Sequence, residues 1–177
     1  MNPDVLIVGG SYAGIAAGLI LARARRPVTV IDAGSPRNRF ASHSHGVLGL
    51  DGISGAELLK TARQQLLDYP TVRWVHAEAV QATASAEGVE VRTADGQVLA
   101  ARKLLLASGV ADQLPALPGL AERWGKAVFH CPYCHGYELG QGRIGVVATG
   151  PMSVHQAELL TDWGDVTLLV NGAVELS

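Results

Sequence analysis

The sequence predicts an α/β protein built from two units with parallel strands, and three observations support this prediction. An apolar run ending in glycines, residues 4–10, is followed by a helical pattern and then by a second apolar run ending in an acid. The same order of elements returns at residues 143–170. Between the two sets, the chain is rich in β-type residues and carries one hairpin signal. Each set is therefore expected to be a right-handed strand–helix–strand unit.

Composition limits the class of protein. The 177 residues suffice for one ordinary domain or parts of two, and 48% hydrophobic against 17% charged residues allow a large core. The net charge is −2 and the one basic cluster, residues 23–26, suits a helix end, so no nucleic acid partner is expected. No apolar run is long enough to span a bilayer, and the first residues lack a signal-peptide pattern, which predicts a cytoplasmic protein without membrane contact.

The first set comprises a strand at 4–10, a helix at 12–25 and a strand at 28–32. The glycine-rich turn between the first strand and the helix has the context of a dinucleotide-binding turn. Gly9 allows a tight turn, Gly14 allows close helix packing, and Asp32 is placed to accept hydrogen bonds from a ribose. The alternative is a turn of this kind that binds no nucleotide. The residues expected to contact a cofactor here are Gly9, Gly10, Ser11, Tyr12, Ala13 and Gly14.

A polar loop at residues 33–52 leads into a second helix. Ser54 and Glu57 form a capping box at its start, and Ile53 and Leu58 are placed to pack as a hydrophobic staple. An apolar stripe along this helix is formed by Leu59, Ala62 and Leu66.

Three β-rich segments follow, at residues 72–84, 88–94 and 97–109. Ala-Asp-Gly at 94–96 is a hairpin signal between the second and the third. Two prolines, Pro115 and Pro118, then mark a linker. We place a domain boundary there, with a first domain at residues 1–112 and a second at 113–177.

The second strand–turn–helix–strand set covers residues 143–150, 151–163 and 165–170. Its turn departs from the dinucleotide pattern, because Ala148 takes the first glycine position and Ser153 the last. The strand after it ends without an acid for NAD or an arginine for NADP. This turn is either a structural remnant or a working site.

The segment His-Cys-Pro-Tyr-Cys-His-Gly at 130–136 contains both cysteines of the chain, Cys131 and Cys134. The letters fit c-type haem attachment, half of a zinc site, or a redox dithiol. A cytoplasmic location weakens the haem interpretation, and a single Cys-x-x-Cys pair offers zinc too few ligands without strain. For a dithiol, Pro132 suits the first turn of a helix, where a thiolate is stabilised, and His135 can exchange a proton. Solvated surface or backbone capping is the alternative role of the histidines.

The order of these motifs resembles the low-molecular-weight thioredoxin reductase family, across essentially the whole chain. The resemblance implies a Rossmann-like FAD-binding domain, three-layered with a parallel sheet and a β-meander, and part of a second Rossmann-like domain carrying Cys-x-x-Cys. It also implies that Cys134 faces the flavin and Cys131 exchanges with substrate. Further cofactor contacts by analogy are Val80, Ala107, Ser108 and Gly109.

Departures from the family pattern are informative. His135 stands where the reductases have Asp, and residues 43–52 and 131–138 look more like relatives that oxidise dithiols in small natural products. Those relatives pass electrons from flavin to oxygen without NADPH. The expected cofactor is therefore FAD, with NADP(H) as a possible second one, and the expected partner is a thiol or disulfide substrate. A full-length protein would be a homodimer.

The family also returns to its FAD domain after the second domain, and this sequence ends before such a return. A fragment or a shortened gene product is therefore expected. A short-chain dehydrogenase is excluded because none of the tyrosines has a lysine four residues later. A non-enzymatic binding module remains a competing interpretation.

Overall fold

The computed structural model describes residues 3–175 in two compact units. The first comprises residues 1–43 and 48–112, and the second comprises residues 44–47 and 113–177. Residues 1 and 2, where the first expected domain begins, and residues 176 and 177, where the second ends, lie outside the described part. Each unit is described by itself.

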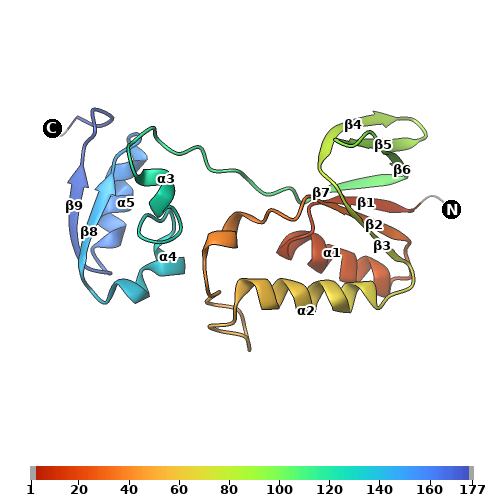
Figure 1. Cartoon of the computed structure of the whole chain (residues 1–177), viewed down its shortest axis with the longest axis horizontal. Helices are drawn as coiled ribbons and strands as arrows, with labels where there is room; N and C mark the ends of the chain where they lie inside the picture. Colours follow the sequence, from red (N-terminus) through yellow and green to blue (C-terminus); the bar gives the residue numbers. More distant parts are fainter. Residues whose placement is uncertain (1–2, 176–177) are drawn as a thin grey trace. The chain divides into compact units, whose positions relative to one another are not determined.

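The first unit is organised around a four-stranded parallel sheet with the order β3-β2-β1-β7. The strands are β1 (Val5–Val8), β2 (Val28–Asp32), β3 (Val72–His76) and β7 (Lys103–Leu106). Two helices, α1 (Tyr12–Arg23) and α2 (Gly55–Leu67), cover one face of this sheet, as Figure 1 shows. The short 3₁₀ helix η1 (Arg37–Phe40) follows β2.

A three-stranded antiparallel meander covers the other face of the sheet. Its strands are β4 (Ala79–Ser85), β5 (Gly88–Thr93) and β6 (Val98–Ala101). The β-rich segments predicted at 72–84 and 97–109 are thus each divided between two sheets, because the chain leaves the parallel sheet after His76 and re-enters it at Lys103. The predicted hairpin turn at 94–96 is confirmed, with Gly96 at a φ of +86°.

Two apolar clusters fill the spaces between these three layers. Between the parallel sheet and the meander lie Leu6, Ile31, Val75, Val89, Val91 and Ala101. Between the sheet and the helices lie Ile7, Ile15, Ala22, Val28, Val30 and Leu66. Alternate residues of β1 and β2 therefore serve opposite faces, as a sheet buried on both sides requires. The predicted three-layer α/β fold is confirmed.

The start of α2 shows how local sequence sets an element boundary. The Ser54 hydroxyl accepts a hydrogen bond from the Glu57 backbone N–H at 3.5 Å, which is one half of the predicted capping box. Leu66 of the predicted stripe is fully buried, and Leu59 and Ala62 pack beside it.

The second unit contains a smaller crossover of the same kind. Strands β8 (Arg143–Val147) and β9 (Asp165–Leu169) pair in parallel, and helix α5 (Met152–Leu160) joins them. Val146, Ala157 and Leu160 form its core. Before β8 lie three short helical turns, α3 (Leu120–Arg123), α4 (Pro132–His135) and η2 (Tyr137–Leu139).

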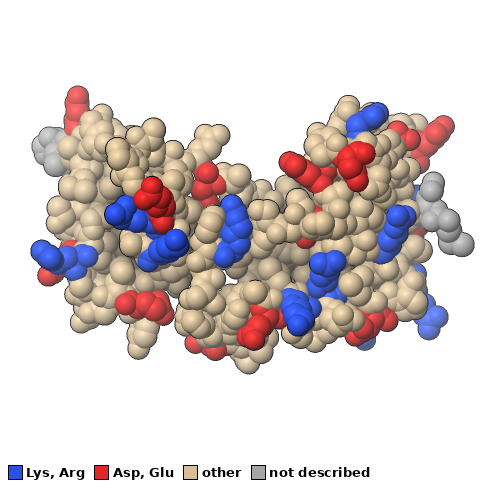
Figure 2. All heavy atoms as spheres, in the orientation of Figure 1, with Lys and Arg blue, Asp and Glu red and all other residues tan. Residues whose placement is uncertain are grey.

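The surface carries charges of both signs. In Figure 2, the acidic and basic side chains are interspersed over the visible face of each unit. Within residues 3–175, no helix combines the length and the apolar character needed to cross a bilayer.

Candidate active site

The glycine-rich turn after β1 has no space for side chains at its two key positions. Gly9 has a φ of +103°, and a Cβ built there would lie 2.2 Å from the Ala107 carbonyl oxygen. A Cβ on Gly14 would lie 1.8 Å from the Gly9 carbonyl oxygen. Glycine is thus required both for the sharp turn and for the close approach of α1 to the end of β1.

Asp32 holds this turn from the neighbouring strand. Its Oδ1 accepts a hydrogen bond of 2.9 Å from the Gly10 backbone N–H. The ring of Trp74 packs against Gly10, where a Cβ would lie 2.3 Å from its Cη2. The carboxylate expected to meet a ribose therefore also fixes the turn on which a pyrophosphate would lie.

The remaining residues predicted at this site divide into two groups. Ser11 is the N-cap of α1, Tyr12 begins this helix, and Ala13 is exposed in its first turn. The Ala107 backbone N–H donates a 2.7 Å hydrogen bond to the Val8 carbonyl, which places the segment 107–109 beside the turn. These residues are brought together at the carboxyl edge of the parallel sheet, where ligands bind in open α/β folds.

Val80 lies elsewhere in the first unit, on β4 of the meander. The register between β4 and β5 shifts between Ala79 and Gln81, so Val80 is the extra residue of a β-bulge. A bulge frees backbone groups from the strand ladder. Its predicted contact with adenine is a backbone contact and stays a prediction.

The first turn fits the pyrophosphate and ribose of a dinucleotide such as FAD. The glycines let the end of β1 and the start of α1 approach each other closely, the N-terminus of α1 follows the turn, and the Asp32 carboxylate stands at the end of β2. The Gly9 and Gly10 N–H groups donate to the Ile31 carbonyl and the Asp32 carboxylate. Ser11 and the first turn of α1 would therefore hold the pyrophosphate, and Asp32 would hold the ribose.

The second turn, between β8 and α5, does not fit a dinucleotide in the same way. The Thr149 backbone N–H donates to the Ser153 hydroxyl at 3.0 Å, and the Asn171 side chain donates to the Ala148 carbonyl at 3.2 Å. Pro151, at the N-cap of α5, has no N–H to offer. Of the donors that would face a pyrophosphate here, the Thr149 N–H is bonded within the chain and Pro151 has none.

The two cysteines lie on one short helical turn of the second unit. Cys131 is the N-cap of α4 and Pro132 is its first residue, as predicted. The two Sγ atoms are 2.6 Å apart, Cys131 is half-buried and Cys134 is exposed. Two thiolates on one tetrahedral zinc ion, each about 2.3 Å from the metal, would lie roughly 3.7 Å apart. The geometry favours a redox dithiol over a zinc site.

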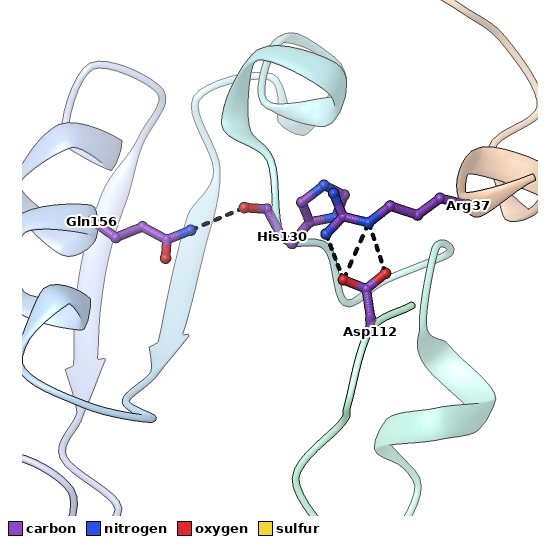
Figure 3. Close-up of polar contacts among 4 residues, drawn as sticks. All are labelled: Arg37, Asp112, His130 and Gln156. Carbon is purple, nitrogen blue, oxygen red and sulfur yellow. Dashed lines mark hydrogen bonds and ion pairs between the residues drawn. The ribbon is translucent and has the colours of Figure 1, made fainter. Parts of the chain in front are cut away.

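Side chains of α5 and of the segment after it hold the cysteine turn in place. Gln156 on α5 donates a 3.1 Å hydrogen bond to the His130 backbone carbonyl, next to Cys131 (Figure 3). The Trp163 ring packs edge-on against Tyr133 at 5.2 Å between centroids. A Cβ on Gly136 would lie 2.4 Å from the same ring, so Gly136 allows this contact.

His135 sits in an apolar position beside two ionisable groups. Its ring stacks on Phe129 at 4.0 Å between centroids, and burial lowers its pKa from the usual value of 6.5. The Glu138 carboxylate opposes this shift and raises the pKa, whereas the nearby His45 lowers it. The Cys131 backbone carbonyl also raises the pKa of His135. Its approach falls short of hydrogen-bond geometry, because within residues 3–175 the buried Nδ1 of His135 has no hydrogen-bond partner. His45 Nε2 lies 3.5 Å from a Glu138 oxygen.

Several residues around both sites were not predicted. Glu138 lies three residues after His135, a spacing that could have indicated a contact. Gly136 could have indicated close packing behind the cysteines. Arg37 and Asp112, which form an ion pair in the first unit (Figure 3), are 75 positions apart and carry no local signal.

Residues 3–176 match the family of pyridine nucleotide-disulphide oxidoreductases. The chain is 39% identical to thioredoxin reductase tcpT of Claviceps purpurea over 98% of its own length and 57% of that protein. It is also 39% identical to thioredoxin reductase aclD of Aspergillus oryzae, over 98% of the chain and 58% of that protein. The chain thus spans a little over half the length of these relatives.

The fold of the chain is also similar to that of solved oxidoreductase structures. An oxidoreductase from Agrobacterium tumefaciens superposes with a TM-score of 0.95 at 52% identity, over 100% of this chain and 60% of the other. HlmI superposes with a TM-score of 0.91 at 38% identity, over 99% of this chain and 56% of the other. The glycine-rich turn, the cysteine turn and these similarities lead to one conclusion: the chain belongs to the pyridine nucleotide-disulphide oxidoreductase family.

Proposed function

We propose that the protein is an FAD-dependent thiol–disulfide oxidoreductase of the thioredoxin reductase type, which exchanges electrons with its substrate through Cys131 and Cys134. The observation that carries the proposal is the 2.6 Å separation of the two sulfur atoms at the start of a helical turn. In this family a redox dithiol of this kind works with a flavin, and the first turn suits the pyrophosphate and ribose of FAD. Residues 1–112 form the cofactor domain in this proposal, and residues 113–177 the redox domain.

The thiol chemistry follows from the two cysteines. In the oxidising direction, a substrate thiolate attacks the Sγ of Cys131 in the disulfide, and Cys134 leaves as a thiolate. A second substrate thiolate then attacks the substrate sulfur of this mixed disulfide, so that the oxidised substrate leaves and Cys131 becomes a thiolate. The chemistry that bound FAD would supply is acceptance of the two electrons of the dithiol, which would let Cys131 and Cys134 form their disulfide again.

The protein's own groups supply position and proton transfer. Cys131 is the N-cap of α4, which holds its Sγ at the start of the helical turn that carries Cys134. His135, whose lowered pKa keeps the ring neutral near pH 7, can take the proton that a substrate thiol releases.

Absorbance spectroscopy and single cysteine substitutions test this function. The protein purified with FAD should show flavin absorbance and should oxidise or reduce a small model thiol such as dithiothreitol. Cys134→Ser and Cys131→Ser should each abolish turnover while keeping the flavin bound. Unchanged turnover in both variants would remove the cysteines from the mechanism, and absence of flavin would favour a binding module without catalytic activity.

A second candidate function is a dithiol oxidase that uses oxygen instead of NADP(H). The observation in its favour is the second turn, where the Ser153 hydroxyl and the Asn171 amide bond the backbone of the turn. Anaerobic mixing with NADPH separates the two candidates, because bleaching of the flavin indicates a reductase. Failure to bleach, together with oxygen consumption in the presence of dithiothreitol, indicates an oxidase.

Location and assembly are part of the same proposal. The substrate is a thiol or disulfide of a small protein or small molecule, and the full-length protein acts as a cytoplasmic homodimer. The resemblance to thioredoxin reductases supports the homodimer. Sedimentation of the full-length protein at micromolar concentration would test it.

A further inference from the structure

Two segments of the first unit leave the parallel sheet on either side of the glycine-rich turn. In the strand order, β1 lies between β2 and β7. The segment after β2 reaches Arg37 in η1, and the segment after β7 reaches Asp112. Because all these strands are parallel, both segments start from the same edge of the sheet as the turn after β1.

A bidentate ion pair joins these two segments. The Arg37 guanidinium donates to the Asp112 carboxylate, with Nε 2.9 Å from Oδ2 and 3.2 Å from Oδ1, and its Nη2 also contacts Oδ1 (Figure 3). The neighbouring residue, Asn38, donates a 2.9 Å hydrogen bond to the Tyr12 hydroxyl at the start of α1. Two consecutive residues of η1 are therefore bonded to different segments: Arg37 to the segment after β7, and Asn38 to the first residue of α1.

The ion pair thus cross-links the segments that follow β2 and β7. Both segments start from the carboxyl edge of the sheet, where the turn at Gly9 lies between them in the strand order.

We propose that Arg37 and Asp112 form a clasp, assisted by the bond between Asn38 and Tyr12, that retains the dinucleotide cofactor at the first turn. This inference rests on the proposed function for the identity of the cofactor, FAD. The two charged residues act on the rate at which the cofactor leaves, and they are positioning residues, not catalytic ones. A bidentate bond between a guanidinium and a carboxylate suits this role, because its two parallel hydrogen bonds fix the orientation of both segments.

The test measures FAD dissociation from the whole chain after dilution, followed by the rise in flavin fluorescence. Arg37→Gln and Asp112→Asn should each release FAD about fivefold faster than the unsubstituted chain, as loss of a partly exposed ion pair implies. The charge reversal of both positions, R37D with D112R, should restore the rate to within about twofold. Arg39→Gln is the matched control, because Arg39 belongs to η1 but contacts Phe40 and the Pro36 carbonyl, and it should dissociate at the normal rate.

A cofactor-free measurement complements the first. Hydrogen exchange in residues 33–43 of the chain without FAD should be faster in Asp112→Asn than in Arg39→Gln, because only the former opens the clasp.

Two results would overturn the proposed clasp and leave the proposed function standing. One is normal FAD dissociation in both Arg37→Gln and Asp112→Asn. The other is fast dissociation in Arg37→Gln alone without restoration by the reversed pair, which would make Arg37 a direct ligand of the cofactor. If the unsubstituted chain does not bind FAD, the proposed function fails and this inference fails with it.

Discussion

His135 shows how three neighbours set the properties of one side chain. Its imidazole is packed on Phe129, so the charged form loses solvation, and this burial is the largest influence on its pKa. The Glu138 carboxylate favours the charged form of His135 and raises its pKa, whereas His45 disfavours the charged form and lowers the pKa. A lowered pKa leaves the imidazole neutral near pH 7, as the proposed role of proton acceptor next to Cys134 requires.

This balance predicts the order of titration midpoints among variants. The His135 midpoint, measured by NMR on the whole chain, should lie below the ordinary 6.5, with Glu138→Gln lower still and His45→Asn higher. Because the folded state binds this proton less tightly than the unfolded state, His135 should destabilise the fold as pH falls below about 6.5 and have no such effect above it. A midpoint that rises in Glu138→Gln would contradict the assignment of these neighbours.

At the residue scale, the sequence predicts the sites that local chemistry defines. The cysteine pair, the glycines of the first turn and Asp32 are recognisable because each is needed at a fixed spacing within a few residues or one crossover unit. Arg37 and Asp112 are not, because their contact depends on the strand order of the folded sheet. Trp163 behind the cysteine turn is missed for the same reason.

At the element scale, hydrophobic periodicity predicts the type of each segment better than its sheet. Both crossover units and the capped helix were predicted correctly, since each carries its own boundary signals. Residues 72–84 read as continuous β structure, yet the chain changes sheets between His76 and Ala79. Period-two alternation is the same in both sheets, so the sequence does not show where one ends and the next begins.

The first turn allows a matched test of why glycine is needed there. Gly9 and Gly49 both have positive φ, at +103° and +77°, but only Gly9 has a neighbouring atom in the place of a Cβ. Gly49→Ala should cost about 1 kcal/mol from backbone strain alone. Gly9→Ala should cost several kcal/mol, about 3 or more, and lose flavin binding, because the methyl group would meet the Ala107 carbonyl.

Urea unfolding of both variants, followed by circular dichroism, measures these costs, and flavin absorbance after FAD addition measures binding. Equal destabilisation by the two substitutions would show that the contact between the turn and Ala107 has no energetic weight.

At the scale of the whole molecule, each unit has apolar clusters of its own. The clusters of the first unit contain residues from α1, α2 and the two sheets, whereas the cluster of the second unit contains residues of β8, α5 and β9. The glycine-rich turn after β1 depends on the clusters of the first unit, and the cysteine turn depends on the cluster of the second. Damage to one core should therefore leave the other site intact.

A pair of equivalent core substitutions tests this independence. Leu66 is fully buried against Gly18, and Leu160 is 8% exposed in the second core. Each substitution by alanine removes about the same apolar volume, so each should destabilise its own unit by about 2–5 kcal/mol. Val98→Ala, at an exposed position of β6, is the control and should change stability by less than about 1 kcal/mol.

Hydrogen exchange followed by mass spectrometry locates the effect of each substitution. Leu66→Ala should accelerate exchange in β1 and β2 and weaken FAD binding, while exchange in β8 and β9 stays as in the unsubstituted chain. Leu160→Ala should give the reverse pattern, with normal FAD binding and faster reaction of Cys131 and Cys134 with a thiol reagent, because α5 supports the cysteine turn through Gln156. Accelerated exchange in both units in either variant would mean that the two cores unfold as one cooperative structure, and the cofactor turn and the cysteine turn would then share a single stability.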